Sequence, residues 1–186
     1  MSFIQKVRIP VDRVGTLIGQ NGNTKAWIEK TCNVKLFIDS ESGEISIVSD
    51  ERPIEFDFRI PKKLVIAISR GFSKTRASSL LNSDNIITVL DLRHYGAKSS
   101  SSVSRLKGRI IGEKGKSRRV IEELTNTDLS VYGHTISIIG SDEDVRRAEY
   151  AINVLLKGGQ HKTAYSLLQK QRRAMKIENL QLWEDN

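Results

Sequence analysis

Cysteine and long apolar runs are almost absent from this sequence. Cys32 is the only cysteine among 186 residues, so no intramolecular disulfide can form, and the chain suits a reducing compartment. No stretch approaches the roughly eighteen apolar residues of a membrane span, and residues 1–6 lack the basic and apolar segments of a secretion signal. We therefore expect a soluble, cytoplasmic protein without membrane contact, with Cys32 as a thiol in its core.

The sequence also lacks the residue clusters of metal sites and hydrolytic centres. His94, His134 and His161 are scattered, and no cysteine stands near them at the spacing of metal ligands. Carboxylates gather at residues 122–123 and 142–144, where helix surfaces and the first turn of a helix account for them. No pair of carboxylates is placed to hold two metal ions. We expect no metal, no cofactor and no catalytic residue, and a nuclease is the alternative from another class, which the missing carboxylate cluster disfavours.

Two nucleotide-binding motifs are missing as well. The string Gly115-Lys116-Ser117 resembles part of a Walker A loop, but that loop needs a glycine where Ile110 stands. The G-x-G-x-x-G pattern of dinucleotide-binding proteins does not occur. Nucleotide hydrolysis and dinucleotide binding therefore have little support.

Positive charge is abundant and unevenly distributed. The chain has 30 Lys and Arg against 22 Asp and Glu, a formal net charge of +8, which fits a polyanionic partner and a merely basic soluble protein equally well, so the distribution of charge must decide. One window carries seven cations and a single anion, Glu113. These cations are Arg105, Lys107, Arg109, Lys114, Lys116, Arg118 and Arg119. Because they surround a glycine-rich loop, the charge distribution indicates a binding site there.

That loop occurs twice. Ile18-Gly19-Gln20-Asn21-Gly22 returns as Ile111-Gly112-Glu113-Lys114-Gly115, 93 positions later. At the same offset Gly15 aligns with Gly108, Ile28-Glu29 with Ile121-Glu122, and Asn33 with Asn126. The chain therefore contains two copies of one domain, which we place at residues 1–83, with a trailing helix, and at residues 84–159. Residues 160–186 form a basic helical extension.

Hydrophobic periodicity predicts the element order β-α-α-β-β-α in each copy, an α+β fold with a three-stranded sheet packed on three helices. In the first copy we expect strands near residues 3–10, 34–38 and 45–47 and helices near residues 11–18, 24–31 and 61–70. In the second copy we expect strands near residues 86–92, 129–131 and 135–139, a serine-rich loop at residues 98–102, and helices from residue 103, after the glycine loop and after Ser141.

A glycine pair between two short helices lets a phosphodiester backbone approach the main chain, and the following helix points its free N–H groups at the phosphates. This is the clamp of KH domains, which holds about four nucleotides of a single strand. We predict two type I KH domains that bind single-stranded RNA. The first site comprises Ile18, Gly19, Gln20, Asn21, Gly22 and Lys25; the second comprises Lys107, Arg109, Ile111, Gly112, Glu113, Lys114, Gly115, Lys116, Arg118 and Arg119; and the tail adds Arg172, Arg173 and Lys176.

Within these sites Ile18 and Ile111 are expected to form an apolar floor for bases. Trp27 could stack on a base, but it aligns with Val120, which favours core packing.

The second half resembles the partner-of-Nob (Dim two) family of ribosome assembly factors. The resemblance rests on Lys107–Arg119, on Ile121–Thr125, on Ser130–Thr135 and on Gly158–Tyr165, where Gln160 replaces a common proline. It implies tandem KH domains that bind the 3′ region of small-subunit ribosomal RNA precursors beside a PIN-domain endonuclease and other assembly or translation factors. The intact first glycine loop and the missing acidic amino-terminal extension resemble the archaeal form. Tandem-KH proteins of transcription or RNA turnover, and a KH scaffold that binds proteins, are the alternatives.

Overall fold

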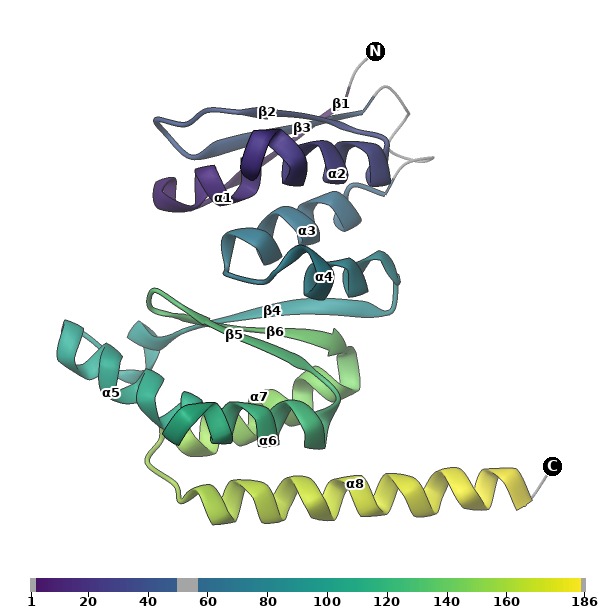
Figure 1. The fold of residues 1–186 in the computed structure, drawn as a ribbon. Coiled ribbons are helices and arrows are strands. Elements are labelled where there is room, and N and C mark those ends of the chain that lie inside the picture. The colour runs from purple at the N-terminus through teal and green to yellow at the C-terminus, as the bar shows by residue number, and fades with distance from the viewer. Residues whose placement is uncertain (1–2, 50–56, 185–186) are drawn as a thin grey trace. The chain divides into compact units, whose positions relative to one another are not determined.

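The computed structural model describes residues 3–49 and 57–184, with the backbone alone at residues 176 and 178–184. The chain forms two compact units, Met1–Ile87 and Thr88–Asn186 (Figure 1). The domain boundaries expected at residues 83 and 159 stay predictions. Within the described ranges no helix is long and apolar enough to cross a membrane.

The first unit has the predicted order β-α-α-β-β-α, followed by two short helical turns. Its elements are β1 (Phe3–Arg8), η1 (Val11–Arg13), α1 (Val14–Ile18), η2 (Gln20–Gly22), α2 (Asn23–Cys32), β2 (Lys35–Ile38), β3 (Glu44–Ser49), α3 (Arg59–Ser69), α4 (Lys74–Ala77) and η3 (Ser78–Leu81). The antiparallel strands lie in the order β1-β3-β2, with Val7 opposite Ile45 and Leu36 opposite Ile47.

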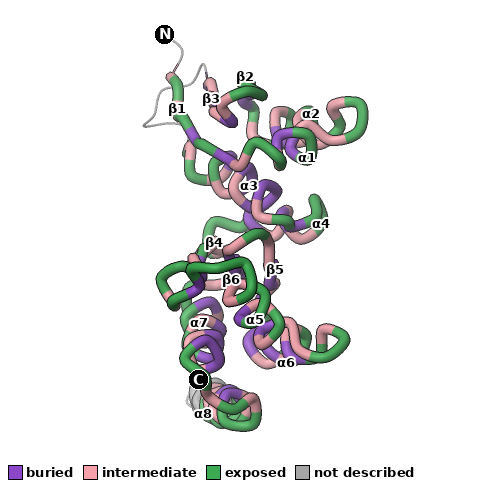
Figure 2. The backbone as a smooth tube through the Cα atoms, turned by 90° about the vertical axis from the view of Figure 1, so that its left-hand side faces the viewer, coloured by how far each residue is buried: buried purple, intermediate pink, exposed green. Residues whose placement is uncertain are grey.

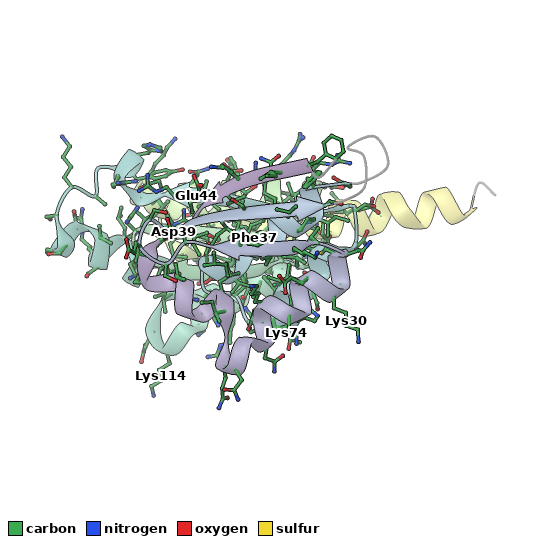
Figure 3. The ribbon with its side chains drawn as sticks, turned by 90° about the horizontal axis from the view of Figure 1, so that it is seen from above. Lys30, Phe37, Asp39, Glu44, Lys74 and Lys114 are labelled. Carbon is green, nitrogen blue, oxygen red and sulfur yellow. The ribbon has the colours of Figure 1, made fainter. Side chains whose placement is uncertain are left out.

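The core of the first unit lies between this sheet and its helices. Leu17, Ile28, Ile47 and Leu64 come from α1, α2, β3 and α3, and all four side chains are fully buried. Residues on the other sheet face remain accessible, and Phe37 is 60% exposed (Figure 3). The alternation of buried and exposed residues along each strand thus orients one face of the sheet toward α1, α2 and α3.

The second sheet and its helices repeat the same plan. The elements are β4 (Asn85–Asp91), η4 (Leu92–Tyr95), α5 (Ser100–Ile111), η5 (Glu113–Gly115), α6 (Lys116–Thr125), β5 (Asp128–Tyr132), β6 (Thr135–Ser141), α7 (Asp142–Leu156) and α8 (His161–Glu184). The strand order β4-β6-β5 matches β1-β3-β2 position for position. The predicted fold class, two α+β domains of type I KH topology, is confirmed.

The serine-rich segment differs from the prediction, which made it a loop. Ser99 is the N-cap of α5, its side chain accepts a hydrogen bond from the Ser102 N–H, and the Ser102 hydroxyl bonds back to the Ser99 N–H. Serine is unfavourable inside a helix but favoured at its start, because its oxygen satisfies free N–H groups there. The prediction was therefore wrong at residues 100–102, which form the first turn of α5.

A repeated Ile-Glu pair holds the second strand of each sheet to the second helix. Ile28 and Ile121 are fully buried. The Glu29 carboxylate accepts a hydrogen bond of 2.8 Å from the Leu36 N–H, and Glu122 accepts one of 2.9 Å from Leu129. The duplicated sequence is thus explained by a duplicated contact that fixes the strand beside the helix.

The long helix α8 packs against α6 and α7 of its own unit. Ala164 and Leu168 are buried, whereas Lys162, Lys170 and Arg172 are exposed (Figure 2). One face of the basic tail therefore covers the second unit and another meets solvent.

Candidate nucleic-acid interface

The two glycine loops have nearly identical backbones. Gly19 and Gly112 lie at φ 76° and 71°, and Gly22 and Gly115 at φ 76° and 77°. The third loop position also has a positive φ, 52° at Asn21 and 49° at Lys114. Three left-handed residues within four positions make a tight turn between two helices, which the glycines adopt without steric cost.

The two glycines of each loop serve different purposes. A Cβ at Gly19 would lie 2.3 Å from the Thr24 hydroxyl, and one at Gly112 would lie 2.6 Å from the Ser117 Cβ. A Cβ at Gly22 or Gly115 would meet no atom within 4 Å. The first glycine therefore packs the loop onto the next helix, whereas the second leaves the main chain open to a ligand.

A helix of ten residues starts directly after each loop. The first N–H groups of a helix have no intrahelical partner; here the first one, at Asn23 and Lys116, donates to the loop carbonyl of Gln20 and Glu113. The helix dipole favours negative charge at this end. The structure thus places an open backbone and a helix amino terminus side by side, in α2 and again in α6. This arrangement suits phosphate groups.

The second loop is rich in cations. Lys114, Lys116 and Arg119 are exposed, and Arg119 Nη2 donates a hydrogen bond of 3.1 Å to the Lys114 carbonyl. Arg118 lies 3.6 Å from the Glu122 carboxylate. The structure therefore gathers the predicted charges around one loop, with Arg118 partly neutralised.

The first loop carries no cation of its own. Asn21, Asn23 and Ala26 stand where the second copy has Lys114, Lys116 and Arg119. Lys25, the predicted phosphate contact, lies 3.8 Å from Glu29 and so repeats the Arg118–Glu122 pair. The first site shares the geometry of the second but not its charge.

Arg109 makes contacts within its own unit that the sequence did not predict. Its Nε donates to the Leu155 carbonyl at 2.9 Å, and its Nη2 donates to the Gly159 carbonyl at 2.6 Å. Arg13 does the same at the end of α3, where it donates to the carbonyls of Ile68 and Ser69. Since the last carbonyls of a helix lack intrahelical partners, Arg109 is engaged at the end of α7, and we remove it from the proposed RNA-contacting set.

Three further predicted contacts are only partly exposed. Ile18, Ile111 and Lys107 are half-buried. Trp27, expected in the core, is half-buried too, and the Lys74 ammonium lies 5.2 Å from the centre of its ring. The indole therefore has an accessible part and a cation beside it.

Residues of α8 lie next to the second loop, and sequence reasoning missed them. A hollow of about 270 Å³ is lined by Gly112, Glu113, Lys116, Ser117, His161 and Tyr165. His161 Nε2 is 2.8 Å from the Arg109 carbonyl. The duplicated Lys-Thr pair at residues 74–75 and 162–163 was the available signal, because it stands a few residues after the third helix in each copy and so marked the two trailing segments as equivalent.

In the tail, Arg172 and Arg173 are exposed and border a second hollow of about 320 Å³ with Leu124 and Gln169. The side chain of Lys176, also predicted to bind RNA, lies outside the described residues. The tail cations thus flank α6, the helix that follows the second loop.

The shifted pKa values have structural causes away from the loops. Burial raises the pKa of the Cys32 thiol to about 11, although this side chain is half-buried and not in the core. The Arg93 guanidinium lowers the pKa of Asp91 to about 2. In residues 3–49 and 57–184 no three His, Cys, Asp or Glu side chains gather as metal ligands, and the expected absence of metal stays a prediction.

Comparison with known proteins places this geometry in a family. Residues 86–173 match the model of the eukaryotic type KH domain (type I), and residues 4–56 match that of the KH domain. A KH domain-containing protein of Methanocaldococcus jannaschii is 40% identical over 181 residues, which span 97% of this chain and 79% of that protein.

Two further similar proteins are themselves associated with RNA. The RNA-binding protein Pno1 of Dictyostelium discoideum is 25% identical over 89% of this chain and 70% of its own length. A chain in the crystal structure of the Pyrococcus horikoshii a/eIF2alpha–aDim2p–rRNA complex is 37% identical, with a TM-score of 0.84 over 93% of this chain and 96% of that one. With two KH folds in tandem and these similarities, the chain belongs to the archaeal branch of the Dim2/Pno1 family of tandem KH-domain proteins.

Proposed function

We propose that the chain is a non-enzymatic, cytoplasmic RNA-binding protein that clamps single-stranded RNA at both glycine loops. The observation that carries this proposal is the pairing of an open second glycine with the amino terminus of a ten-residue helix, present twice in the same backbone conformation. A ligand with closely spaced anions and a thin backbone fits this arrangement, and a single RNA strand has both properties.

The division of labour follows from the geometry. The main chain at Gly22 and Gly115 admits the sugar-phosphate backbone, and the first N–H groups of α2 and α6 face the phosphates. Lys114, Lys116 and Arg119 supply charge at the second loop, and Ile18 and Ile111 offer apolar surface to the bases. Gly15 and Gly108, one helical turn before the loops, leave further open backbone, since a Cβ there would meet no atom within 4 Å.

The RNA in this proposal is the 3′ region of the small-subunit ribosomal RNA precursor, and the protein acts as an assembly factor beside a PIN-domain endonuclease. Membership of the Dim2/Pno1 family supports the ribosomal target, because one relative is named as a pre-rRNA-processing protein and another was crystallised with rRNA. Crosslinking in cells followed by sequencing tests it. If the crosslinked reads map to messenger RNA and none map to precursor rRNA, the alternative of a role in transcription or RNA turnover would be favoured.

The decisive test in vitro compares the loops by matched substitutions. Glu113→Asp with Lys114→Asp removes the Lys114 cation and leaves two carboxylates where phosphates are proposed to bind, which should lower affinity for single-stranded RNA by at least about tenfold, one charge-assisted contact. The same pair at Gln20 and Asn21 should cause a smaller loss. Unchanged thermal melting excludes misfolding as the cause. If neither pair weakens binding, the loops are not the clamp, and a protein-binding scaffold becomes the better explanation.

Incubation with magnesium or manganese tests the non-enzymatic part of the proposal. A precursor rRNA fragment should stay intact. Cleavage by stringently purified protein that disappears when one named carboxylate is substituted would overturn it.

A further inference from the structure

The first loop has a geometry for phosphate binding but lacks the cations that accompany it in the second. The residue after its second glycine is Asn23, whereas the equivalent position in the second copy is Lys116. The backbone angles of the two loops differ by only a few degrees. If both loops clamp RNA, as proposed above, the first needs a cation from elsewhere.

Lys74 provides a cation at this position from another element. It is the first residue of α4, the short helix that follows the KH core of the first unit. Its Nζ lies 3.4 Å from the Asn23 side-chain oxygen and 5.2 Å from the centre of the Trp27 ring. Both partners belong to the first two turns of α2, so the ammonium group lies next to the helix amino terminus (Figure 3).

The partners of Lys74 leave its charge available. An amide oxygen and an aromatic face attract a cation without neutralising it. Among the described residues no carboxylate forms an ion pair with Lys74, in contrast to Lys25, which lies 3.8 Å from Glu29. Lys74 is also exposed, so an incoming anion can reach it. Asn23 and Trp27 therefore hold an uncompensated positive charge beside the loop.

We propose that Lys74 completes the phosphate site of the first glycine loop, in the position that Lys116 occupies in the second. The inference rests on the proposed RNA clamp and names the residue that supplies its charge in the first unit. Trp27 acts as a positioning residue, because its ring orients the Lys74 side chain. The half-buried state of Trp27 fits this role, since a tryptophan enclosed in the core could not support an exposed cation.

The second unit shows the same use of a trailing helix. There α8 follows the third helix, and its first turn lies beside the glycine loop through the 2.8 Å contact between His161 Nε2 and the Arg109 carbonyl. The Lys74-Thr75 pair of α4 has its counterpart in Lys162-Thr163 of α8. In both units, therefore, the segment behind the KH core lies at the loop.

The test isolates the first loop in the full chain. In protein that carries Glu113→Asp and Lys114→Asp, residual binding of oligouridylate reports on the first unit. Lys74→Gln should lower this residual affinity about tenfold, as expected for one charge-assisted contact, and flatten the log–log salt dependence by about 0.7. Lys74→Arg should retain affinity, because a guanidinium keeps the charge and stacks on Trp27.

Lys30→Gln is the matched control, since Lys30 is an exposed lysine of α2 about 10 Å further along the helix. It should change neither affinity nor slope by a comparable amount. An equal loss at Lys30 would show a general charge effect and overturn the role of Lys74. A second readout uses Trp183→Phe, which leaves Trp27 as the only tryptophan. RNA should then shift Trp27 emission, and Lys74→Gln should reduce that shift.

Failure of the inference and failure of the clamp give different results. If Lys74→Gln has no effect while Gln20→Asp with Asn21→Asp abolishes the residual binding, the first loop is a clamp without Lys74. If the background protein does not bind RNA at all while the unmodified protein does, the first loop is not a clamp, and both the inference and the two-loop form of the proposed function are overturned.

Discussion

The two glycine loops share their backbone and differ in where their charge comes from. In the second unit Lys114 lies in the loop and Lys116 is the first residue of α6, whereas the same positions of the first unit hold Asn21 and Asn23. Asparagine tolerates the left-handed conformation that both loops require at their third position. Backbone geometry therefore restricts the third loop position, whereas Asn23 and Lys116 have ordinary helical angles, so the charge at that position can vary without a backbone cost.

The same comparison holds at the end of the third helix. Arg13 of η1 and Arg109 of α5 both donate to carbonyls at the end of the helix that packs against them, α3 in one unit and α7 in the other. At the repeat offset, however, Arg13 aligns with Leu106 and Arg109 with Thr16. An arginine thus contacts the end of the third helix in both units, but from two positions of the repeat that are about one helical turn apart.

The largest expected effect separates the two glycines of the second loop. Gly112→Ala should destabilise its unit by about 3 kcal/mol, because alanine at φ 71° and ψ 177°, a region that is essentially restricted to glycine, costs about 1–3 kcal/mol and its Cβ would also collide with Ser117. Gly115→Ala adds only the backbone cost, since its Cβ meets open space. The melting temperature of Gly112→Ala should therefore be well below that of Gly115→Ala.

RNA affinity should rank the same two variants differently. At temperatures where both are folded, Gly115→Ala should weaken RNA binding, because its methyl group projects into the open side of the loop. Gly19→Ala and Gly22→Ala repeat the experiment in the first unit. Equal stability losses for both glycines in either loop would contradict the assignment of packing to one and ligand access to the other.

A smaller loss is expected from the repeated glutamates. Glu122→Ala leaves the Leu129 N–H without its partner, and Glu29→Ala does the same to Leu36, at a cost of about 2 kcal/mol each. Glutamine retains an acceptor oxygen, so Glu122→Gln and Glu29→Gln should recover most of the stability. Chemical denaturation measures both pairs. Two alanine losses that differ by more than about 1 kcal/mol would show that the contact is not equivalent in the two units.

Sequence was sufficient for the features that depend on local conformation. The two glycine loops between helices were predicted correctly, because positive φ restricts residue choice, and the aligned residues Asn33 and Asn126 also share a positive φ. The serine run was misassigned, since serine favours a loop and a helix N-cap equally well. Arg109 and Lys74 could not be assigned, because the direction of a long side chain depends on which helix packs beside it. The predicted RNA contacts themselves stay predictions.

Arg109→Met should have a modest effect on stability and none on the electrostatics of RNA binding. Removing two hydrogen bonds to the carbonyls of Leu155 and Gly159 should cost about 1 kcal/mol, the scale of cation contacts at a helix carboxyl end. Arg13→Met is the matched change in the first unit. Under conditions where both variants are folded, the salt dependence of RNA binding should equal that of the unmodified protein. A flatter slope for Arg109→Met alone would return Arg109 to the phosphate-contacting set.

The smallest expected effect concerns α8, which has no counterpart of similar length in the first unit, where α4 and η3 end at Leu81. Arg172→Gln with Arg173→Gln should reduce the salt slope of RNA binding by at most about 0.7 per lost phosphate contact. The effect is small because both side chains, although exposed beside α6, lie about two turns or more beyond the residues that line the hollow at the loop. Thermal stability should not change, since the packing face of α8 is formed by buried residues such as Ala164 and Leu168. Leu168→Ala is the opposite control, because it should lower stability by about 2–5 kcal/mol and leave the salt slope of the folded protein unaltered. If neutralising both arginines alters neither affinity nor slope, α8 serves to cover α6 and α7 or to bind a protein, and RNA contact in the second unit is confined to the glycine loop and its surroundings.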